Sequence, residues 1–138
     1  MSVPAAYLLD TNIVLRYLMN DHPEHSRAAK KLIENAGNGK VVLHLPFIAI
    51  TETIFTLQKF YGVAREDIGR ELMKVMTAPG VKLAGPSWVL QAVEEYGMRN
   101  VSFGDACLAA EARAENFTVA SFDRGIDALP GVRRYEPG

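Results

Sequence analysis

Five short apolar runs alternate with longer segments of helical spacing, and this alternation constrains the fold of the 138-residue chain more than any other feature. Most of the runs lack regularly placed polar residues, which is typical of strands buried on both faces of a parallel sheet. Alternating strands and helices predict an α/β fold with a mainly parallel sheet. The predicted strands cover residues 6–9, 41–45, 81–83, 118–121 and 132–135.

The intervening segments place apolar residues every three to four positions, as amphipathic helices do. Asp21, with Glu24 three residues later, predicts the capped start of one helix, and Gly37-Asn38-Gly39 predicts its end. Further helices are expected over residues 47–61, 68–76, 88–96 and 104–115. We find no internal repeat and no long linker, so a single domain over residues 1–138 is expected.

Charge and cysteine content exclude several classes of protein. Fifteen Lys and Arg residues against sixteen Asp and Glu residues give a net charge of −1, which excludes a polybasic nucleic-acid binder. The single cysteine, Cys107, excludes a disulfide framework and a multi-cysteine zinc site, and its apolar surroundings predict a buried structural thiol. The N-terminus lacks the basic start of a signal peptide, and the longest apolar run is too short to span a bilayer. We therefore expect a cytoplasmic protein that does not act at a membrane.

Four of the sixteen carboxylates stand next to apolar residues, whereas the other twelve lie among polar, turn or helix-surface residues. Asp10 directly follows the first apolar run, and Asp123 follows the fourth in the same way. Glu52 interrupts the apolar helix predicted over residues 47–61, and Asp105 opens an alanine-rich helix. A buried carboxylate is unfavourable unless it is paired, protonated or bound to a metal.

Each of these acids can instead serve only the local structure around it. Asp105 can complement the dipole of its helix, and Asp10 and Asp123 can each cap the helix or turn that follows. Glu52 is harder to account for in this way, because it sits mid-helix and shares a predicted face with Ile48 and Phe55.

Taken together, the four acids indicate a site for a hard cation. In open α/β sheets ligands bind beyond the carboxyl ends of the strands, which is where two of these acids stand. Few basic residues lie beside any of the four, so ion pairing does not account for them. Oxygen-only ligands of this kind suit Mg²⁺ or Mn²⁺.

The order of the acid-bearing segments resembles that of the PIN domain, and specifically the small single-domain ribonuclease toxins called VapC. The resemblance rests on Asp10-Thr11-Asn12 after an apolar strand, Glu52 within an apolar helix, Phe103-Gly104-Asp105-Ala106, and Ser121-Phe122-Asp123. It covers essentially the whole chain. Two departures, the less stereotyped segment around Glu52 and Gly104 before Asp105, leave the acids untouched.

The resemblance implies a three-layer α/β/α sandwich around a parallel five-stranded sheet of order 3-2-1-4-5. In that order the first and fourth strands are neighbours, which would place Asp10 beside Asp123. It further implies an endoribonuclease that depends on Mg²⁺ or Mn²⁺. Carried onto this sequence, the catalytic acids are Asp10, Glu52, Asp105 and Asp123, and the supporting residues are Thr11, Asn12 and Ser121.

From this resemblance follows a hypothesis for the metal site. Asp10 and Asp105 bind the principal ion, and Asp123 and Glu52 complete its shell through water or hold a second ion. A divalent metal activates water and offsets phosphoryl charge, which hydrolysis of RNA requires. Outside the four acids, fifteen basic residues face twelve acidic ones, a balance of +3 that is compatible with approaching RNA.

Local structure alone also accounts for the supporting residues. Thr11 and Ser121 fit equally well as cap or turn residues, and Asn12 fits as the start of the first helix. Arg16, one turn beyond Asn12, either reaches an RNA phosphate or belongs to a solvated helix face.

The resemblance also implies partners. Besides the RNA substrate, these are a second copy in a homodimer and a cognate antitoxin encoded nearby. DNA would be contacted only indirectly, through the antitoxin. The alternative function is a non-catalytic PIN-like module that acts through a protein partner or DNA binding. Metal titration separates the two, because only the enzyme needs an ion at the four acids.

Overall fold

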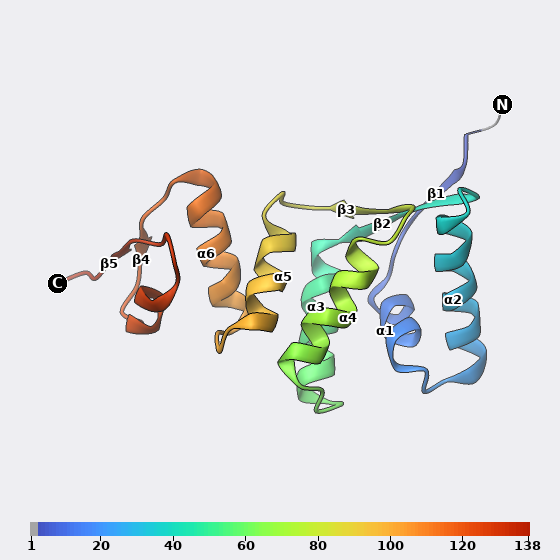
Figure 1. The fold of residues 1–138 in the computed structure, drawn as a ribbon, viewed down its shortest axis with the longest axis horizontal. Helices are drawn as coiled ribbons and strands as arrows, with labels where there is room; N and C mark the ends of the chain where they lie inside the picture. The colour runs from blue at the N-terminus through green and yellow to red at the C-terminus, as the bar shows by residue number, and fades with distance from the viewer. Residues whose placement is uncertain (1–2) are drawn as a thin grey trace.

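The computed structural model describes residues 3–138, and each predicted strand and helix is present in it, along with a short 3₁₀ helix, η1 (Figure 1). The α/β class is therefore confirmed. In chain order the elements are β1 (Ala5–Leu8), α1 (Thr11–Met19), α2 (Pro23–Gly37), β2 (Val41–Pro46), α3 (Phe47–Lys59), α4 (Arg65–Met76), β3 (Val81–Ala84), α5 (Val89–Met98), α6 (Phe103–Glu115), β4 (Val119–Ala120), η1 (Arg124–Ala128) and β5 (Arg134–Tyr135).

The start of α2 differs from its prediction. His22, not Asp21, occupies the cap position, and its side chain accepts a hydrogen bond from the backbone N–H of His25 at 3.2 Å. Pro23 fixes the first helical position, where its missing N–H costs nothing. The helix ends at Gly37, as the glycine pair predicts.

All strand pairs are parallel, as predicted, but they form two sheets rather than one. β2 lies between β1 and β3, with Ala5 opposite Val41 and Leu43 opposite Val81. β4 pairs with β5 alone, with Val119 opposite Arg134. Within residues 3–138, β1 and β4 are not paired, so the expected order 3-2-1-4-5 is not formed.

Helices α5 and α6 separate the two sheets. Figure 1 shows the helices side by side from α2 at one end to α6 at the other, with β4 and β5 beyond α6 and β1 at the far end. All four residues of β1 are exposed, Tyr7 by 51% and Leu8 by 69%. The expectation that this run is buried on both faces is wrong, because the other elements of residues 3–138 leave the side chains on both of its faces exposed.

Two apolar clusters follow from this arrangement. The larger joins the three-stranded sheet to helices α1 to α6, with Leu43 and Leu45 of β2 fully buried at its centre. The smaller contains Ala112 of α6, Val119 of β4 and Ile126 of η1. Within residues 3–138, no helix combines the length and apolar character needed to cross a membrane.

The side chain of Arg113 connects the second sheet to the helices. Arg113 on α6 donates through Nη2 to both carboxylate oxygens of Glu95 on α5, at 3.1 and 3.0 Å. Its Nε donates to the carbonyl oxygen of Pro130, just before β5, at 2.6 Å. A single side chain thus connects α5, α6 and the segment that leads into β5.

Candidate functional site

Asp10 lies between β1 and α1 with its side chain exposed. It occupies the cap position of α1, yet its carboxylate makes no capping hydrogen bond; only its backbone carbonyl accepts from Ile13, at 3.0 Å. A capping role therefore does not account for this carboxylate. Thr11 begins α1 and is half-buried, and Asn12 is exposed beside a cavity between α1 and α2.

Glu52 shares a face of α3 with Ile48 and Phe55, as predicted, but this face is turned to solvent. Ile48 is 60% exposed and Phe55 is 56% exposed, and Glu52 is exposed between them. The expectation of a carboxylate held in apolar surroundings is therefore wrong for this chain. The helix was predicted correctly, whereas the burial of that face depends on what packs against it.

Asp105 stands in the first turn of α6 and is half-buried. Its backbone N–H donates to the side-chain oxygen of Ser102, the cap residue, at 3.1 Å. This position fits a role in complementing the helix dipole, because a negative charge in the first turn is favourable there.

Asp123 caps η1, the 3₁₀ helix. Its Oδ1 accepts from the backbone N–H of Gly125 at 2.8 Å, and its own N–H donates to Ser121 Oγ at 3.0 Å. The cap and turn roles are thus confirmed for both residues. Arg134, which sequence reasoning did not single out, donates to the Ser121 carbonyl at 3.0 Å and lowers the pKa of Asp127 by hydrogen bonding to its carboxylate.

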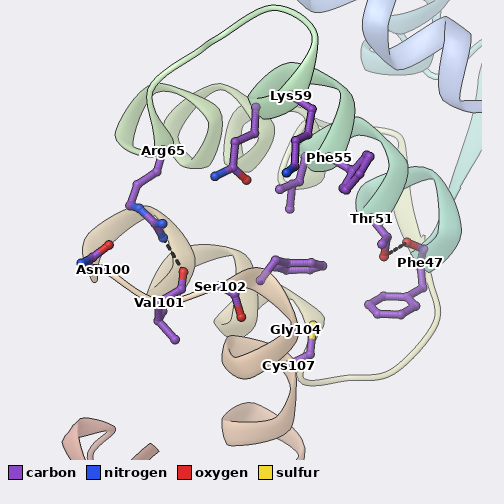
Figure 2. A pocket seen from close by; sticks show the side chains of 13 residues that line it. Phe47, Thr51, Phe55, Lys59, Arg65, Asn100, Val101, Ser102, Gly104 and Cys107 are labelled. Atoms are coloured by element: carbon purple, nitrogen blue, oxygen red, sulfur yellow. Dashed lines mark hydrogen bonds between the residues drawn. The ribbon is translucent and has the colours of Figure 1, made fainter. Parts of the chain in front are cut away.

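A cavity of about 530 Å³ lies between α3, α4 and the start of α6 (Figure 2). Phe47, Phe55 and Phe103 are among its lining residues, and the rings of Phe47 and Phe103 are 6.3 Å apart between centroids. The cavity borders the two helices that carry Glu52 and Asp105, although neither carboxylate lines it. The regular spacing of Phe47 and Phe55 on one helix is the sequence signal that would have pointed to it.

Arg65 holds the segment that leads to Asp105. Its guanidinium lies 4.7 Å from the centre of the Tyr96 ring. Its Nη1 donates to the carbonyl oxygens of Tyr96 and Arg99, each at 3.0 Å, and to that of Val101, the bond drawn in Figure 2. The end of α5 and the turn into α6 are therefore fixed by one cation.

Cys107 lies in the wall of the same cavity and is half-buried, so it is less enclosed than predicted. Burial raises the pKa of its thiol to about 11, with a smaller contribution from Glu111. A thiol that stays protonated at neutral pH is a poor nucleophile, in agreement with a structural role.

The four predicted acids are not gathered in the structure. Within residues 3–138, no group of three His, Cys, Asp or Glu side chains is close enough to hold a metal ion. The carboxylates of Asp10, Glu52 and Asp105 make no hydrogen bond or ion pair with other described residues, so as donors they suit a hard cation. The chemistry of these carboxylates fits a metal ion, whereas their positions in the structure of a single chain do not.

Comparisons with known proteins add the following. The family model described as the PIN domain matches residues 7–132. No curated protein matches the sequence. Among solved structures, the chain is similar to one in the crystal structure of VapBC2 from Rickettsia felis bound to a DNA fragment from their promoter. That similarity has 16% sequence identity and a TM-score of 0.39, and covers 95% of this chain and 98% of the other.

Proposed function

Because this chain belongs to the PIN domain family, we propose that it is a metal-dependent endoribonuclease and the toxin of a toxin–antitoxin pair. The observation that carries the proposal is the position of Asp10 and Asp123. Each follows a parallel strand within three residues of its carboxyl end, with its side chain exposed. Ligand sites in parallel α/β folds lie at such ends. The proposal treats residues 1–138 as one domain that works in the cytoplasm.

Mg²⁺ or Mn²⁺ is held by Asp10 and Asp105 in this proposal, and Asp123 and Glu52 act through water or a second ion. An ion held there would supply an activated water and would offset charge on the phosphodiester. Thr11, Asn12 and Ser121 are the supporting residues in this proposal, and Ser121 Oγ accepts a hydrogen bond from the backbone N–H of Asp123 at 3.0 Å. A sheet of order 3-2-1-4-5, which residues 3–138 of one chain do not form, would place β4 beside β1 and bring Asp10 and Asp123 together.

The remaining partners follow from the same proposal. Outside the four acids, basic residues exceed acidic ones by three, which favours a polyanion such as RNA while keeping the affinity modest. A cognate antitoxin inhibits the enzyme and provides the only connection to DNA.

The test is cleavage of a labelled single-stranded RNA by the purified chain, with Mn²⁺, with Mg²⁺ and with EDTA. We expect cleavage only with metal, and the Asp10→Asn and Asp105→Asn variants should not exceed the EDTA background. Glu111→Gln is the matched control, because Glu111 is an exposed acid on the same helix as Asp105. Metal-dependent activity of Asp10→Asn equal to that of the unaltered chain contradicts the assignment.

The alternative, a non-catalytic interaction module, gives a different result. It leaves the RNA intact under all three conditions. In calorimetric titrations with Mn²⁺, the unaltered chain and Asp10→Asn then behave alike. These two results together would contradict the proposed nuclease activity and support the non-catalytic module.

A further inference from the structure

We propose that two copies of this chain complete each other's sheet, with the β4 edge of one copy pairing in parallel with the β1 edge of the other. This pairing places Asp10 of one copy beside Asp123 of the second copy. The use of these acids as a metal site rests on the proposed function, whereas the pairing itself does not.

The outer edge of β1 is open and apolar. The N–H of Leu9 donates to the carbonyl of His44 on β2 at 2.8 Å. Because alternate residues of a parallel strand face opposite neighbours, Ala6 and Leu8 turn their backbone groups away from β2. Tyr7 and Leu8 are among the exposed large apolar residues of the chain. An open edge of this kind is a template for another strand.

The outer edge of β4 matches it. The N–H groups of Val119 and Ser121 donate to carbonyls on the β5 side, at 2.8 and 3.0 Å. The backbone of Ala120 therefore faces away from β5. Phe122, just beyond the strand, is 74% exposed. Both edges belong to parallel sheets and both carry exposed apolar side chains, so pairing would bury apolar surface on each.

The chain's own β4 is held away from its β1. The two strands lie at opposite ends of the molecule, with α3 to α5 between them (Figure 1). Ala106 and Ala110 of α6 are fully buried in the larger cluster. The bonds from Arg113 to Glu95 and Pro130 then fix the second sheet to α5 and α6. Folding back would break these contacts, whereas pairing with a second copy keeps them.

A two-fold arrangement pairs the β1 and β4 edges of both copies, since each copy gives one β4 and receives one. Each composite sheet then has five strands, β3-β2-β1 from one copy and β4-β5 from the other. Neighbouring strands are about 4.8 Å apart, so the acids at their carboxyl ends become neighbours. This accounts for the absence of a three-acid group within residues 3–138 of one copy.

Light scattering coupled to gel filtration provides the first test. We expect a dimer for the unaltered chain and a monomer for Leu8→Lys, because pairing would bury the new charge. Leu8 is largely exposed in the single chain, so the lysine leaves the fold intact, as circular dichroism should verify. Met98→Lys is the matched control at another exposed apolar residue and should remain dimeric. A monomeric unaltered chain, or equal dimers of all three, overturns the proposal.

Cross-linking tests the pairing without any reference to activity. Leu8→Cys and Ala120→Cys are placed in separate chains that also carry Cys107→Ala, and the two proteins are mixed and treated with a short bis-maleimide. We expect a covalent dimer that contains one chain of each kind. In a second experiment, both cysteines are placed in one chain. If cross-linking then gives only a product of monomer mass, the strands pair within the chain and the proposal is overturned.

Complementation then connects the pairing to the site. Asp10→Asn and Asp123→Asn chains are refolded together, so that each mixed dimer has one composite site with both native acids. Random mixing should restore about a quarter of the unaltered activity, since half the dimers are mixed and each has one intact site of two. If the unaltered chain is active and the mixed variants recover no activity, the proposal is overturned. If the cross-linked dimer forms but the unaltered chain cleaves no RNA, the pairing is supported and the proposed function is contradicted.

Discussion

Gly69 and Gly97 meet backbone to backbone where α4 packs against α5. A Cβ atom on Gly69 would lie 2.8 Å from the Cα of Gly97, and one on Gly97 would lie 3.1 Å from the Cα of Gly69. Only glycine fits both positions without moving a helix. We expect Gly69→Ala to lower the free energy of unfolding by about 1–3 kcal/mol, the usual cost of overpacking. Urea denaturation followed by circular dichroism measures it.

Gly37→Ala is the control for this substitution. Gly37 is the last residue of α2, and no heavy atom lies within 4 Å of the position that its Cβ would take. Its replacement should change the free energy of unfolding by less than about 0.5 kcal/mol. Equal losses in the two variants would mean that the helix contact does not require glycine.

Replacement of Arg113 should loosen the second sheet. Arg113→Ala removes two bonds to Glu95 and one to Pro130, and we expect a loss of about 1 kcal/mol because Arg113 is partly exposed. Amide exchange over residues 117–135 should become faster. Arg99→Ala is the control, since Arg99 reaches the same Glu95 at 3.4 Å from a more exposed position. The prediction fails if both variants accelerate exchange there equally.

Acid should weaken the connection between the α1–α2 loop and the end of α3. The Tyr61 hydroxyl and then Arg16 lower the pKa of Asp21 by hydrogen bonding to its carboxylate, at 2.7 and 2.8 Å. A lowered pKa contributes stability above about pH 4, the usual value for Asp, and this contribution is lost as the pH falls through the folded value. Tyr61→Phe should therefore lower the melting temperature at pH 6 and less so at pH 2. Parallel pH profiles for the two proteins would contradict this.

The thiol of Cys107 should react slowly with iodoacetamide at pH 8, because burial raises its pKa to about 11. Its alkylation rate should rise as the pH passes from 9 to 11, whereas the urea-denatured chain should follow an ordinary thiol pKa of about 8.5. A raised pKa also means that the protonated thiol contributes stability below the unfolded pKa, which is lost as the pH rises through the folded one. Identical rate profiles for folded and denatured chains would show that the thiol is not buried.

Local signals in the sequence predicted the elements well. The spacing of apolar residues predicted α3 and α4, and Gly62 lies just beyond α3, at the predicted end. The turn role of Asp123 was also foreseen, because a cap depends only on residues two positions away. Such features need no knowledge of the rest of the chain.

Features that depend on distant segments were not predictable from the sequence. The apolar run of β1 predicted burial, but its exposure depends on which segments from elsewhere in the chain pack against it. Glu52 shares its face with Ile48 and Phe55 as predicted, and only the packing of other elements decides whether that face is covered. The three carbonyls that Arg65 binds are 31 to 36 residues away and carry no side-chain signal.

In the proposed dimer, the open edge of β1 makes the number of complete sites depend on protein abundance. If each pair of acids needs two copies, the number of assembled sites in dilute solution varies with the square of the chain concentration, so halving the dose leaves about a quarter of the sites. Small amounts of protein would then form few complete sites, and a burst of synthesis would form disproportionately many. An exposed strand of four residues, Ala5–Leu8, would thereby set the dose at which the molecule acts.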